Sequence, residues 1–197
     1  MSGDGAAEIP LFPLQTVLFP GGRVPLRIFE QRYMAMAKAC LRDDSCFGVC
    51  LIRDGREVGE PALPEDVGCT ARIVEWDMPQ LGVLQIVARG GRRFRILERR
   101  VRADGLALAS VELLGEQSDA PLDAVEHICA RVLKRIVDAA PAGLVELPPR
   151  YDSCAWVSAR LAEILPLSTV SKQRLLEMDD ARARIEILRR LISSSGR

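Results

Sequence analysis

The chain has 197 residues, of which 48% are hydrophobic and 27% are charged, a composition typical of a soluble globular protein with one or two domains. The 27 basic and 27 acidic residues give a formal net charge of zero. A neutral chain has no surplus of Lys and Arg to displace the counterions of a phosphate backbone, which argues against a general nucleic-acid binder.

The first part of the chain is predicted to form short strands and one inserted helix. Residues 9–14 are apolar but contain two prolines, which predicts an edge strand, and residues 24–28 predict a second strand. Apolar residues then recur at helical spacing over 30–41, which predicts a helix. Residues 47–52 form a continuous apolar run, typical of a buried strand. The acidic stretch 54–66 has two prolines and predicts a loop.

Two hairpins are predicted next. Residues 69–76 alternate in polarity, and residues 83–88 follow across a turn that contains Met78. Residues 94–101 and 106–113 are joined by an Asp-Gly pair, which is a strong hairpin signal. At least six short strands with one inserted helix indicate a small closed or half-closed β barrel.

The apolar pattern becomes helical in the last part of the chain. A stripe of apolar residues over 122–137 predicts a helix of about four turns. Ser153 and Ser168 are placed to cap two further helices, and Asp179 or Asp180 is placed to cap the last. We therefore predict a bundle of three or four helices.

This change of pattern predicts two domains and an α+β fold class. The β barrel is expected over residues 1–116 and the helical bundle over residues 117–197. Residues 1–8 do not resemble a secretory signal peptide, because they contain two acidic residues and no apolar core. No apolar run approaches the roughly 18 residues that span a bilayer, so we expect a cytoplasmic protein without a membrane segment.

No group of residues predicts a catalytic, metal or cofactor site. The six cysteines have no CxxC spacing and the single histidine, His127, lies in a predicted helix, so we expect buried reduced thiols. The sequence has no GxxxxGK[ST] phosphate loop and no GxSxG motif. Ser171 and Lys172 could supply a Ser–Lys dyad, but as neighbours at a helix start their side chains diverge. We expect no enzyme and no cofactor.

Seven arginines and one acidic residue lie between residues 89 and 102, so this segment carries seven minus one, or six, positive charges. On a strand, alternate arginines would point outward, which makes Arg93, Arg95 and Arg99 candidates for binding an anion or nucleic acid. The alternative is a solvated strand face that pairs with the acidic stretch 54–66. The neutrality of the whole chain favours this second interpretation.

Two apolar groups are candidates for binding a partner. Trp76, Met78 and Leu81 lie at the predicted turn of the first hairpin, and exposed apolar side chains often mark a binding surface. The alternative is a loop folded over the end of the barrel. Tyr33 and Met34 on the inserted helix are expected to belong to the core rather than to a binding groove.

Residues 9–33, IPLFPLQTVLFPGGRVPLRIFEQRY, closely resemble the opening of the amino-terminal domain of Lon proteases. Further matches to that family follow in order at 47–49, 68–73 and 91–96, and residues 165–184 are similar to its helical part. The resemblance therefore extends over nearly the whole chain.

The motif itself suggests roles for four of its residues. Phe29 and Tyr33 would anchor the inserted helix to the barrel, and Glu30 and Arg32 could form hydrogen bonds at the start of that helix.

The resemblance implies a PUA-like β barrel followed by an α-helical bundle. It also implies a non-catalytic, polypeptide-binding module resembling the substrate-recognition domain of Lon proteases. Such a module could act as an adaptor in protein quality control, with unfolded polypeptides and a protease or chaperone as partners. Neither the ATPase nor the Ser–Lys protease activity of that family is expected, since this sequence has neither region. The alternative is nucleic-acid or small-ligand binding through the barrel and the basic strand Arg89–Arg102.

Overall fold

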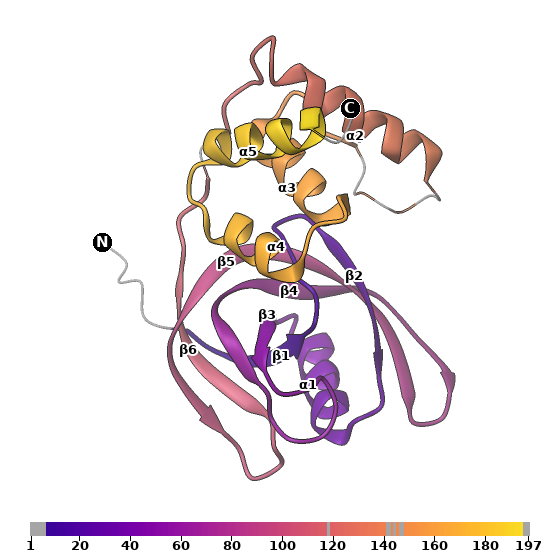
Figure 1. Ribbon diagram of the computed structural model, residues 1–197. Coiled ribbons are helices and arrows are strands. Elements are labelled where there is room, and N and C mark those ends of the chain that lie inside the picture. Colours follow the sequence, from indigo (N-terminus) through magenta and orange to yellow (C-terminus); the bar gives the residue numbers. More distant parts are fainter. Residues whose placement is uncertain (1–6, 118, 141–142, 144, 146–147, 195–197) are drawn as a thin grey trace. The chain divides into compact units, whose positions relative to one another are not determined.

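The computed structural model, drawn in Figure 1, describes residues 7–117, 119–140, 143, 145 and 148–194. The chain divides into two compact units, Met1–Leu114 and Gly115–Arg197, and each is described by itself. The first unit contains the β sheet and one helix, and the second contains four helices.

Unit 1 is a mixed six-stranded sheet with the order β2-β5-β4-β3-β1-β6. An additional pairing of β5 with β6 closes five of these strands into a barrel, and β2 is attached outside it to the first half of β5. The strands are β1 (Ala7–Leu14), β2 (Arg23–Ile28), β3 (Phe47–Asp54), β4 (Leu63–Gln80), β5 (Val83–Val101) and β6 (Ala107–Leu113).

The first strand, β1, lies inside the sheet, so the prediction of an edge strand is wrong. Residues Ala7–Pro10 pair with β6, whereas Leu11–Leu14 pair in parallel with β3. Each half of β1 is thus paired along one side, and each half contains one proline. A proline is tolerated at a position where its nitrogen does not face a ladder partner. The two prolines therefore indicate only that their own nitrogens have no ladder partner. A strand can meet this condition without lying at the edge of the sheet.

The inserted helix α1 (Gln31–Arg42) packs on one face of the sheet and completes the larger hydrophobic core. Tyr33, Met34 and Met36 are buried in that core. The ring of Tyr33 lies against Phe12 of β1, with ring centroids 4.2 Å apart. The Tyr-Met stripe is therefore core, as predicted.

A second, smaller core is built around Phe94, which is fully buried. Two glycines on neighbouring strands make room for its ring. A Cβ atom on Gly48 would lie 2.7 Å from Phe94 Cζ, and one on Gly68 would lie 2.6 Å from the same atom. Small residues at these positions are therefore required by the packing of the barrel.

Unit 2 contains the helices α2 (His127–Ala139), α3 (Cys154–Ile164), α4 (Thr169–Glu177) and α5 (Ala181–Ser194). The predicted caps are confirmed. Ser153 Oγ accepts from the backbone N–H of Trp156, and Ser168 Oγ accepts from that of Ser171. The helix predicted from residue 122 begins later than expected. Within the described ranges, no helix is long and apolar enough to cross a membrane.

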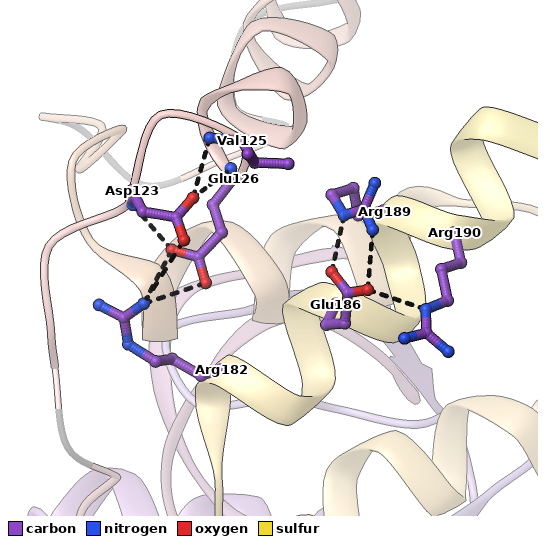
Figure 2. Close-up of polar contacts among 7 residues, drawn as sticks. All are labelled: Asp123, Val125, Glu126, Arg182, Glu186, Arg189 and Arg190. Atoms are coloured by element: carbon purple, nitrogen blue, oxygen red, sulfur yellow. Dashed lines mark hydrogen bonds and ion pairs between the residues drawn. The ribbon is translucent and has the colours of Figure 1, made fainter.

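A reciprocal pair of side chains closes the turn that leads into α2 (Figure 2). Asp123 Oδ1 accepts from the backbone N–H of Glu126, and Glu126 Oε2 accepts from that of Asp123. This is the geometry of a capping box, which satisfies backbone donors at a helix start. Glu126 is buried, and Arg182 of α5 donates to its carboxylate at 3.3 Å. The pair therefore ties two helices together.

Candidate functional site

The hairpin of β4 and β5 continues beyond the part of β4 that pairs with β3, and we name residues 72–89 the β4–β5 arm (Figure 1). The strands are longer than the sequence predicts. Pairing reaches Gln80 and Val83, so the turn consists only of Leu81 and Gly82. Gly82 has φ = 84°, a conformation that other residues rarely adopt in so short a turn.

The three predicted peptide-binding residues all lie on this arm with their side chains in solvent. Trp76 is 61% exposed, Met78 is 39% exposed and Leu81, at the turn, is 97% exposed. The alternative, a loop folded over the end of the barrel, is not what the structure shows. Exposed apolar side chains of this kind are typical of a surface that a partner covers.

A groove of about 440 Å³ lies on the arm, and its walls come from three strands. The lining residues form three cross-strand rows, because each residue of β5 stands between one of β2 and one of β4. The rows are Pro25, Val87 and Glu75; Leu26, Ile86 and Trp76; and Arg27, Gln85 and Asp77.

The groove combines apolar surface with charges of both signs. Glu75 forms an ion pair with Arg23 of β2, which ties β2 to β4 on either side of β5. Asp77 Oδ1 accepts a hydrogen bond of 2.8 Å from the backbone N–H of Met78. Arg27 contributes a positive charge at the rim on β2. This groove could not be predicted from the sequence, because β2 is distant in the sequence from the β4–β5 hairpin with which it forms the rows.

The three candidate anion-binding arginines do not share one exposed face. Arg93 is only 3% exposed. Arg95 is exposed and stands opposite Glu112, whereas Arg99 is half-buried and stands opposite the buried Ala109. A β-bulge between residues 96 and 98 shifts the alternation, so Arg95 and Arg99 turn to different faces. The predicted regular alternation of these arginines is therefore wrong.

Other arginines of this basic strand already have partners. Arg100 forms an ion pair with Glu8 at 2.7 Å, and Arg102 forms one with Asp104 at 3.0 Å. Arg99 reaches the acidic stretch 54–66, but its Nη1 donates to the backbone oxygen of Ala62 rather than to a carboxylate. The segment is therefore less available to a polyanion than its charge suggests.

The start of α1 differs in part from the prediction. Arg32 is buried, forms an ion pair with Glu30 at 2.9 Å and donates to the backbone oxygen of Gly105 at 3.1 Å. Arg32 thus ties the helix to the β5–β6 hairpin. Phe29 does not anchor the helix, because its side chain is 51% exposed. The anchoring role belongs to Tyr33.

The candidate Ser–Lys pair does not form a dyad, and the thiol of Cys129 is held protonated. Ser171 Oγ lies 2.9 Å from Ser168 Oγ, whereas Lys172 Nζ donates to the backbone oxygen of Glu163, so no Ser–Lys dyad forms. Burial raises the pKa of Cys129 to about 11, which keeps that thiol protonated at neutral pH. Within the described ranges, no group of three or more His, Cys, Asp or Glu side chains is placed to hold a metal ion.

Comparison with known proteins gives the family of this chain. Residues 8–194 match the family model described as the ATP-dependent protease La (LON) substrate-binding domain. The chain belongs to this family. The predicted LON assignment is therefore confirmed, and so is the α+β fold of a PUA-like barrel with a helical bundle.

Relatives of this LON domain include whole proteases and a solved single domain. It is 26% identical over 199 residues to the Lon protease of Anaeromyxobacter dehalogenans, covering 96% of this chain and 23% of that protein. It is 30% identical over 118 residues to protein cereblon of Xenopus tropicalis, covering 58% of this chain and 25% of that protein. The crystal structure of a Lon N-terminal domain protein from Xanthomonas campestris has a TM-score of 0.77 and 40% identity, with 92% of this chain and 96% of that chain covered. The LON domain thus spans about a quarter of the length of the curated relatives it matches.

Proposed function

We propose that this LON domain binds unfolded or partly folded polypeptides on the β4–β5 arm, without catalysing a reaction on them. The observation that carries the proposal is the exposure of Trp76, Met78 and Leu81 at the outer end of one hairpin. Removing a fully exposed side chain such as Leu81 from water contributes about 1.5–3 kcal/mol, and the partly exposed Met78 contributes less. Membership of the LON substrate-binding family supports the same role.

The polypeptide-binding role is tested by fluorescence anisotropy with a labelled, reduced and carboxymethylated lactalbumin, which stays unfolded. Anchor residues of an interface typically cost about 2 kcal/mol or more when truncated, so Trp76→Ala with Met78→Ala should raise Kd at least about tenfold. Val170→Ala removes an equally exposed apolar side chain from α4 and serves as the control. Equal binding by the double variant and the control would refute the assignment of the site.

We further propose that the domain acts in the cytoplasm as an adaptor that delivers bound polypeptides to a protease or chaperone. The proposal rests on the family, in which whole Lon proteases contain a region similar to this chain. The test is the rate at which a Lon-type protease degrades the same labelled lactalbumin with and without added domain. An adaptor raises this rate, and the double variant at Trp76 and Met78 does not. A domain that leaves the rate unchanged or lowers it is not an adaptor for that protease.

Nucleic-acid binding by the basic strand is supported less well. Of its three candidate arginines only Arg95 is exposed, and Arg100 and Arg102 are already paired with carboxylates. If such binding existed, affinity for RNA would fall steeply with salt concentration. Retention on an RNA column at low salt is the measurement that decides it.

A further inference from the structure

The outer half of β4 has an open edge. Pairing of β4 with β3 extends along the barrel to Phe47 and Ala71, and β3 begins at Phe47. Beyond Ala71, β4 pairs with β5 on its other side as far as Gln80. In the part of the chain that the structure describes, no strand continues the position of β3 beside residues 72–80.

The hydrogen bonds of the neighbouring strands determine which backbone groups face this edge. Gly90 N donates to Gly22 O at 2.8 Å, so the backbone of Gly90 turns toward the β2 side. The register between β2 and β5 is regular from residue 89 to residue 84, and backbone groups along a strand point alternately to its two sides. The N–H and C=O groups of Val87 and Gln85 therefore point toward β4.

The same alternation applies to β4. Glu75 stands opposite Val87 and Asp77 stands opposite Gln85, so the backbones of these two residues pair with β5. Trp76 lies between them, and its N–H and C=O consequently face the open edge. A free edge of this kind is a template on which another extended chain can pair.

The outer end of this edge is protected. The register with β5 shifts after Asp77, where the Met78 N–H donates to the carboxylate of Asp77 and the next residue, Pro79, has no N–H. Proteins limit unwanted pairing by placing charged residues and prolines on edge strands. These two features confine any added strand to a short segment around Trp76.

Side chains on the two faces of β4 indicate which segments would fit beside it. Trp76 is exposed on the face shared with its partner Ile86, and an apolar residue on an added strand would cover it. Glu75 and Asp77 alternate with Trp76 and lie on the other face. Arg23 pairs with Glu75, whereas the carboxylate of Asp77 accepts a hydrogen bond from the backbone N–H of Met78. A basic side chain beside Asp77 would therefore add an ion pair.

From these contacts we infer that unfolded polypeptide binds by adding a strand to the edge of β4 at Trp76, preferring segments in which apolar and basic residues alternate. This inference rests on the proposed function and specifies how the polypeptide is held. Main-chain hydrogen bonds provide sequence-tolerant affinity, which suits a domain that accepts many substrates, and the alternate side chains provide selectivity.

The experiment uses the whole domain and a fluorescein-labelled peptide of about eight residues that alternates valine and lysine, close to the usual length of a strand. Single N-methyl groups are placed in turn at each peptide bond, and Kd is measured by anisotropy. Changing the peptide rather than the protein avoids any loss of folding. Strand addition predicts a period of two, with N-methylation weakening binding about tenfold at bonds that face β4 and little at those between, because only the former remove a hydrogen bond.

Selectivity is measured with a matched peptide that alternates valine and glutamate. At low salt the lysine peptide should bind several-fold more tightly, and Asp77→Asn, which keeps the hydrogen-bond acceptor but removes the charge, should reduce this difference. If N-methylation has no effect or a uniform one while binding still requires the Trp76 side chain, strand addition is overturned and the proposed function stands. If neither the peptides nor unfolded lactalbumin bind, both proposals fail.

Discussion

The packing around Phe94 makes Gly68→Ala a sharp test of the barrel. The added Cβ would lie 2.5 Å from the backbone oxygen of Val49, 2.6 Å from Phe94 Cζ and 2.7 Å from Cys50 Sγ. Inserting a methyl group into a filled core costs about 1–3 kcal/mol, and a backbone oxygen cannot rotate away, so the upper end applies. Reduced freedom of the unfolded chain offsets up to about 1 kcal/mol of this, which leaves a net loss of about 2 kcal/mol.

The assay is urea unfolding followed by far-UV circular dichroism, with the midpoint and the slope fitted separately. Gly115→Ala is the matched control, because a Cβ at that position meets no atom within 4 Å, and its stability should stay within about 0.5 kcal/mol of the parent. Adding Phe94→Leu to Gly68→Ala should not restore the parent stability, since the contact with Val49 remains. A Gly68→Ala variant as stable as the Gly115→Ala control would refute the close packing described here.

Two further predictions concern ionisation. Hydrogen bonds from Arg189 and Arg190 lower the pKa of Glu186 to about 2 (Figure 2), so this group stabilises α5 fully above its ordinary pKa of 4.5 and loses that contribution as the pH falls toward 2. An NMR titration should show this midpoint near 2 in the parent and nearer 4.5 in the variant with both arginines changed to glutamine; an unshifted midpoint in the parent would contradict the contacts. Burial raises the pKa of the Cys50 thiol, so a disulfide reagent should modify the half-buried Cys46 first and the buried thiols only on unfolding. Rapid reaction of several thiols in the folded protein would contradict this burial.

The β4–β5 hairpin formed as predicted from the sequence, whereas the basic face of β5 did not. The alternating polarity of residues 69–76 and the turn before residues 83–88 allowed the β4–β5 hairpin to be predicted, because both signals are local. The bulge after Ile96 could not be predicted, since it depends on how β5 fits against β6 while the barrel closes. That single inserted residue separates Arg95 from Arg99 and removes the expected basic face.

The difference between local signals and strand pairing also applies to the exposed residues Trp76 and Phe29. Trp76 was identified as a candidate because a tryptophan near a turn is unusual, whereas the groove beside it consists of rows contributed by β2, β5 and β4. Such rows form only after distant segments pair, so no window of the sequence contains them. Phe29 shows the reverse case, since an apolar residue in the family motif is exposed rather than buried.

The sequence by itself determined the family, the strand-then-helix order, the inserted helix and the serine caps, because each depends on residues near one another in the chain or on a motif at fixed spacing. Only the tertiary structure decided that β1 is paired on both sides in succession, that Phe94 needs two glycines, and that β4 keeps an open edge at Trp76. These features depend on which strands become neighbours when the barrel closes, and that choice is made by packing across the whole sheet rather than by local preference.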